Sequence, residues 1–227
     1  MAIIYQNPNG KISGRLGPIY ARIVKGRNIF AIMPIPTGRL YDTLTQQYQK
    51  FKVAVQFCSA LSLYPKLKAL NESLRGRFFS GYHALVSKNF KLVGLTAPTE
   101  FNSIVVSGFG MVASDINLTE TAVTAVIPAL NAQTEVPADA TQVRFLGSIV
   151  YSDPVDPLTD PPFQVTGVEK AIATYNFAAV YNLSQTLSPF QQKLGTTYQR
   201  KTVYIAAVLE STTGLVLSNS SSTAAVL

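Results

Sequence analysis

Few side chains in this chain of 227 residues are suited to acid, base or nucleophilic chemistry. His83 is the only histidine and Cys58 the only cysteine, so a Ser-His-Asp triad would have to use His83. No acid lies near His83 in the sequence. Cys58 falls on the apolar face of an expected helix, where a free cysteine usually packs as a small hydrophobe. We therefore expect no catalytic residue in this chain.

The acidic residues cluster once, between residues 152 and 162, where Asp153, Asp156 and Asp160 alternate with four prolines. Their spacing does not follow the Asp-X-Asp-X-Asp-Gly pattern of an EF-hand. A site built from His and Cys would need more than one of each. The prolines remove backbone donors and fix the chain, which indicates a long, stiff loop. We expect no metal and no cofactor, and the alternative is a weak cation site within an oligomer.

Aromatic side chains beside basic ones are a further candidate, because nucleobases stack on aromatic rings. The chain holds 12 Phe and 11 Tyr, and residues 75–79 read Arg-Gly-Arg-Phe-Phe. Aromatic residues at helical spacing belong more often to a core. We therefore expect Phe78 and Phe79 to be core residues.

Three helices are expected between residues 37 and 92. Apolar residues recur with helical period over 37–64, and Pro65 ends that pattern. A second helix covers 66–75 and a third runs near 79–92. The apolar face expected for the first helix consists of Leu44, Tyr48, Phe51, Val55, Cys58 and Leu61.

Before these helices, glycine and proline interrupt short extended segments. Residues 3–5 form a short strand, and 18–33 read as a basic β-hairpin. The glycine-rich segment 10–17 lacks the Gly-Lys-Ser/Thr ending of a phosphate loop, and no buried strand precedes it. We expect residues 1–33 to contact neighbouring subunits, and the alternative is packing on the chain's own sheet.

After a linker at 95–98, the pattern changes to short apolar runs rich in Val, Ile, Phe and Tyr. Proline, aspartate and glycine separate these runs, which is typical of an antiparallel sandwich. The fold class is therefore α+β, with an N-terminal β-hairpin and short helices joined to an Ig/fibronectin-like β-sandwich. The expected strands of this sandwich are 101–107, 121–128, 142–151, 171–182, 202–210 and 214–218.

Charge divides the chain in the same place. Residues 1–97 hold fourteen Lys/Arg and two acids, a net charge of +12, whereas 98–227 carry −5. The division indicates a basic hairpin and helical region over 1–97 and a β-sandwich domain over 98–227. The basic half either faces nucleic acid, meets the acidic half of a neighbouring copy, or forms a solvated surface without a dedicated partner. The residues expected to make such contacts are Lys11, Arg15, Arg22, Lys25 and Arg27.

Several segments in this order resemble a family of uncharacterised proteins of Bacteroidota and their phages, known only as a domain of unknown function. The resemblance lies in segments 10–17, 25–27, 50–54, 79–84, 88–90 and 213–220. It departs at the loop 152–162 and at the tail 221–227. It implies no catalytic residue and no activity, and it fits a helical N-terminal part joined to a sandwich.

Composition points to assembly. Only 14% of residues are charged, against about 25% in typical soluble domains. Part of this weakly charged surface is expected to be buried against other subunits, unless Ser, Thr, Asn and Gln coat it. We expect a non-enzymatic structural protein that self-assembles, as a phage virion component (capsid, tail or connector), with copies of itself and other virion proteins as partners. The alternative is a nucleic-acid-binding protein that uses the basic half.

The expected location is the virion or the cytoplasm. No Sec-type signal peptide is evident at the N-terminus, and no apolar run approaches the ~20 residues that span a bilayer.

Overall fold

The computed structural model describes residues 2–4, 14–16, 19–24, 27–32 and 42–227. The chain divides into two compact units, residues 1–43 and residues 44–227. Each unit is described by itself. The predicted boundary between residues 97 and 98 falls inside the second unit.

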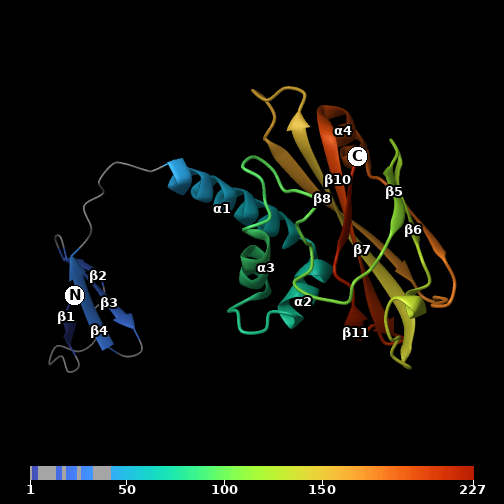
Figure 1. The fold of residues 1–227 in the computed structure, drawn as a ribbon, viewed down its shortest axis with the longest axis horizontal. Helices are drawn as coiled ribbons and strands as arrows, with labels where there is room; N and C mark the ends of the chain where they lie inside the picture. Colours follow the sequence, from blue (N-terminus) through green and yellow to red (C-terminus); the bar gives the residue numbers. More distant parts are fainter. Residues whose placement is uncertain (1, 5–13, 17–18, 25–26, 33–41) are drawn as a thin grey trace. The chain divides into compact units, whose positions relative to one another are not determined.

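The first unit contains a small antiparallel sheet (Figure 1). The predicted hairpin is confirmed, because β3 and β4 are antiparallel and pair from Ile19 opposite Ile32 to Val24 opposite Arg27. One further strand pairs with each edge of this hairpin, which gives the strand order β1-β4-β3-β2. The described strands of this sheet are β1 (Ala2–Ile4), β2 (Gly14–Leu16), β3 (Ile19–Val24) and β4 (Arg27–Ile32).

The second unit begins with the three predicted helices, α1 (Asp42–Leu61), α2 (Pro65–Ser73) and α3 (Gly81–Asn89). Proline supplies the first position of α2, where its missing N–H costs no hydrogen bond. The side chain of Ser80 caps α3 by accepting from the backbone N–H of His83. All three helices lie close to the ranges expected from the sequence.

Two antiparallel sheets follow the helices. The larger has the order β11-β10-β7-β8, with β12 also paired to β10, and the smaller has the order β5-β6-β9. Between β9 and β10 lies α4, which begins with a capping box of Ser188 and Gln191. The elements are β5 (Ser114–Leu118), β6 (Ala122–Ile127), a 3-10 turn at Leu130–Ala132, β7 (Ala140–Pro154), β8 (Phe163–Ile172), β9 (Tyr181–Thr186), α4 (Pro189–Thr197), β10 (Tyr198–Ser211), β11 (Val216–Asn219) and β12 (Thr223–Val226).

The larger sheet carries a hydrophobic core on each face. On one face Ile149 and Ile205 pack with Ile127 and Leu183 of the smaller sheet. On the opposite face Val150, Tyr204 and their neighbours pack with the three helices. The second unit therefore has three layers, with helices, a five-stranded sheet and a three-stranded sheet in that order (Figure 1).

The α+β class with antiparallel sheets is confirmed, whereas the finer Ig/fibronectin-like description is not. Both sheets are open, and helices cover one face of the larger sheet. The predicted strand at 101–107 is wrong, because this segment is irregular. The predicted run 171–182 covers the end of β8, a turn and the start of β9.

Side-chain amides explain the irregular segment. Asn71 of α2 donates to the carbonyl of Ile104 and accepts from the backbone N–H of Val106. Asn89 of α3 does the same with both backbone groups of Ser103. Backbone N–H and C=O groups of this segment therefore form hydrogen bonds with buried side-chain amides, so they need no neighbouring strand.

The phase predicted for α1 is wrong in its first half. Tyr48 and Phe51 are 69% and 50% exposed. The buried residues begin later, and they are Val53, Ala54, Phe57, Cys58 and Leu61. Only the second half of α1 therefore packs on the large sheet.

Replacing Phe57 by alanine is expected to lower the free energy of unfolding by about 3–5 kcal/mol, because its ring is fully buried against Tyr204. The matched change Phe51→Ala should cost no more than about 1.5 kcal/mol, since that ring keeps one edge contact with Phe90. Urea denaturation of the two variants measures the difference. Equal losses would show that the first half of α1 is also covered.

Candidate functional site

The five basic residues predicted to make contacts all fall in the first unit. Lys11 and Lys25 lie outside the described residues. Arg15 lies in β2 opposite Tyr20, Arg22 in β3 opposite Ile29, and Arg27 in β4 opposite Val24. Arg22, whose side chain is described, is exposed. The contact role of these residues stays a prediction.

The small sheet of the first unit has one apolar face. The pairing register puts Ile19 opposite Ile32 and Ala21 opposite Phe30, and Ile23 follows on the same side of β3. Among the side chains described in this unit none is buried, and Ile32 is 75% exposed. The described part of the unit thus supplies one layer and no second layer over its apolar face.

A second uncovered apolar surface lies on the first half of α1. Leu44, Tyr48 and Phe51 are spaced four and three residues apart, so they share one side of the helix. All three are exposed. The first turns of α1 extend past α2 and α3, whereas its later turns pack on the large sheet (Figure 1). This row of three side chains is called the α1 row below.

The loop between α2 and α3 presents another exposed aromatic side chain. Phe79 is 87% exposed, so the prediction that it belongs to the core is wrong. Phe78 is partly buried, with the guanidinium of Arg77 5.8 Å from its ring centroid. The spacing of Phe79 from Tyr82 suits a helix face, but α3 begins only at Gly81. Phe79 therefore lies before the helix whose face it was expected to join.

The residues considered for catalysis lie in different settings. The side chain of His83 is exposed near this loop, with its Nδ1 2.7 Å from the hydroxyl of Ser80. Cys58 is fully buried in the core beneath the helices, and the amide of Asn89 lies 3.9 Å from its sulfur. Burial raises the pKa of Cys58 to about 12, although the contact with Asn89 lowers it slightly. A protonated, inaccessible thiol is a poor nucleophile at neutral pH.

The three aspartates of the predicted loop flank the turn between β7 and β8. Asp153 has a positive φ of 58°, and Asp156 accepts from the backbone N–H of Leu158 and the hydroxyl of Thr159. These two bonds hold the pKa of Asp156 below its usual value, the Thr159 bond most. Within the described residues no three His, Cys, Asp or Glu side chains are grouped to hold a metal ion. Asp156 acts as a turn residue.

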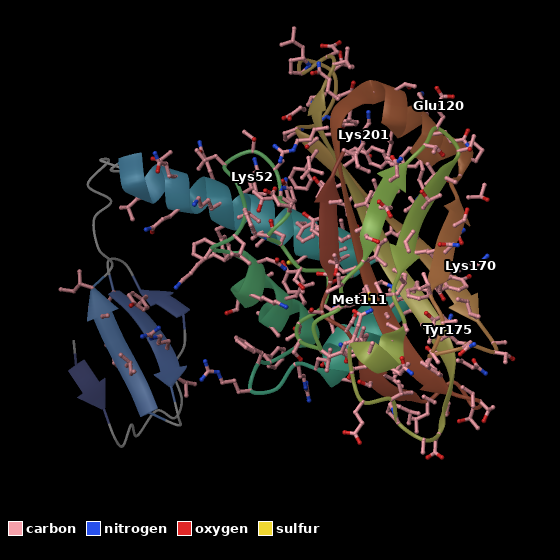
Figure 2. All side chains as sticks on the ribbon, turned by 45° about the vertical axis from the view of Figure 1, so that its right-hand side comes forward. Lys52, Met111, Glu120, Lys170, Tyr175 and Lys201 are labelled. Atoms are coloured by element: carbon pink, nitrogen blue, oxygen red, sulfur yellow. The ribbon has the colours of Figure 1, made fainter. Side chains whose placement is uncertain are left out.

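A cleft with a volume of about 730 Å³ lies beside α4 and the turn before β6. Its charged lining residues are Glu120, Lys193 and Lys201, two of which Figure 2 labels. A smaller cleft of about 270 Å³ lies between the end of α1 and the α2–α3 pair. The side chains that line either cleft do not indicate one particular class of ligand.

Comparison with known proteins returned nothing for this chain. No protein-family model, no curated protein and no solved structure matches it. The resemblance to the family of Bacteroidota and their phages therefore stays a prediction. No helix among those described combines the length and apolar character that crossing a membrane requires.

Cys58 provides a test of this site assignment. In the native protein at pH 8 its reaction with iodoacetamide should be at least roughly a hundredfold slower than in urea. The raised pKa alone lowers the thiolate fraction by roughly a thousandfold. Stability should also fall as pH rises from about 9 to about 12, because the unfolded thiol loses its proton first.

The matched control is Ser59→Cys in a Cys58→Ala background, which moves the thiol to the next, exposed position of α1. This control should react at a similar rate in native and denatured protein. Mass spectrometry follows the labelling. A native Cys58 as reactive as the Ser59→Cys control would contradict a buried, inert thiol.

Proposed function

We propose that this chain is a non-enzymatic structural protein that assembles with copies of itself, as a component of a phage virion (capsid, tail or connector). The β-rich second unit serves as the rigid body of the particle in this proposal. Its two packed sheets act as an Ig/fibronectin-like sandwich that keeps its shape while neighbours bind.

The observation that carries this proposal is the apolar face of the first unit, over which the described residues of that unit place no second layer. A sheet with one apolar face is stable in water only when a second layer covers that face. The described residues of the unit provide no such layer over Ile19, Ile23 and Ile32. A second copy of the chain can provide it by packing the same face against its own.

The α1 row supports the same proposal. A helix of this length owes most of its stability to packing of an apolar face, yet the first half of α1 has Tyr48 and Phe51 in solvent. Large aromatic residues in such a position are typical of interface anchors. Low charge also fits, since few charged groups need to be desolvated when such surfaces meet.

Polar substitutions on this apolar face should weaken assembly. The variant Ile19→Thr/Ile23→Thr/Ile32→Thr keeps β-branched side chains and therefore strand propensity, but it removes apolar area. We expect the full chain to sediment as an oligomer, and this variant to associate at least about tenfold more weakly. Electron micrographs of the full chain should show closed shells, tubes or rings.

The matched control is Val155→Thr/Leu158→Thr/Val180→Thr, which changes three exposed apolar residues of the second unit. This control should assemble like the parent chain. Deleting residues 1–43 should leave a folded second unit, because the described residues of its two hydrophobic cores begin at Val53. This unit should associate more weakly than the full chain, because only the α1 row remains to make contacts. A full chain that stays monomeric at about 100 μM, or an Ile-to-Thr variant that assembles unchanged, would rule out the proposal.

A further inference from the structure

The backbone of Phe79, whose ring is exposed, is held in place by hydrogen bonds. Arg75 donates from Nη1 to the carbonyl oxygen of Phe79 at 3.0 Å and to Oε1 of Glu72 at 3.1 Å. The other oxygen of Glu72 accepts from the backbone N–H of Gly81 at 2.7 Å. The loop is therefore fastened to α2 on both sides of Phe79.

Close packing adds to this restraint. A Cβ atom at Gly81 would lie 2.4 Å from the backbone of Asn71, so α3 meets α2 at a contact that only glycine allows. The ring of His83 lies edge to face with Phe79, with 5.9 Å between their centroids. An aromatic side chain that is both exposed and pre-organised loses little entropy when it binds a partner.

Basic residues are frequent in the helical segment that carries this ring. Residues 44–97 contain eight Lys/Arg and a single acid, Glu72, which is already bonded to Arg75 and Gly81. Lys68 lines the small cleft next to Gly81, and Arg77 is exposed two residues before Phe79. The segment from α2 to α3 thus combines exposed cations with an accessible ring.

We propose that the loop of residues 74–80, with the basic side chains beside it, binds single-stranded nucleic acid. Phe79 stacks on an unpaired base, and Lys68 and Arg77 contact the phosphates on either side of it. A stacking contact requires an open base face, which a duplex does not present along its length. The inference goes beyond assembly, because Phe79 belongs neither to the first unit nor to the α1 row.

An acidic surface of a neighbouring copy is the rival partner for the same charges. Such a surface would satisfy Lys68 and Arg77 but would give Phe79 no flat apolar ring on which to stack. The 87% exposure of that ring therefore favours nucleic acid. The two partners also differ in how strongly each depends on Phe79.

Fluorescence anisotropy with the full chain tests the inference, using a labelled 20-nucleotide oligo-dT and a 20-base-pair duplex as probes. We expect oligo-dT to bind more tightly than the duplex, and Phe79→Ala to weaken oligo-dT binding about tenfold. The control Leu158→Ala removes an even more exposed apolar side chain from the β7–β8 turn and should bind like the parent chain.

The charge test compares Lys68→Gln/Arg77→Gln with Lys170→Gln/Lys193→Gln, which removes the same charge from the other half of the chain. The first pair should flatten the slope of log K against log salt by about 1.4, or about 0.7 per phosphate contact. The second pair should leave the slope unchanged. The inference would be overturned if the duplex bound more tightly than oligo-dT, or if both charge pairs lost affinity equally. It would also be overturned if Phe79→Ala had no effect, or if poly-glutamate bound the protein as tightly as oligo-dT.

Discussion

The pairing of β7 with β10 is the constraint on which the second unit depends. Their register runs from Tyr198 opposite Pro154 to Ser211 opposite Ala140, and both strands are buried on both faces. Alternate residues of each strand point to opposite sides, so the pair needs a cover on each. The helices cover one side, and the three-stranded sheet of β5, β6 and β9 covers the other. Towards one end of the pair, Glu210 takes a bidentate contact from Arg144, which keeps a buried carboxylate satisfied.

This two-sided burial explains which parts of the fold the sequence predicts. Strands with apolar residues on both faces give continuous apolar runs, and 142–151 and 202–210 are such runs. The helices show their period because only one side of each is apolar. Segment 101–107 has the same β-branched composition as a strand, yet buried amides of Asn71 and Asn89 hold it in an irregular path. Those partners lie in helices 14 or more residues earlier in the chain, so local composition carries no sign of them.

The candidate surfaces were harder to predict, for a related physical reason. A sequence shows that a residue is apolar, but it does not show whether another helix or sheet packs over that residue. The period of α1 continues from Leu44 to Leu61, although the large sheet covers only its second half. Phe79 looked like the first residue of a helix face, and the helix begins two residues later. Among the five basic residues expected to make contacts, the structure describes the side chain of Arg22 alone, so charge pattern remains their main support.

The two proposed contacts, through the apolar surfaces and through the loop of residues 74–80, would depend differently on salt concentration. Apolar contacts are insensitive to moderate salt, whereas exposed charges are screened within about 10 Å at 0.1 M salt. In the proposed assembly, contacts through Ile32 or Tyr48 would therefore persist at salt concentrations that release a polyanion from the cations near Phe79. If each copy in an assembly presents one such loop, weak single contacts add along a strand held close to all of them. Assembly would then raise the affinity for nucleic acid without any change in the loop itself.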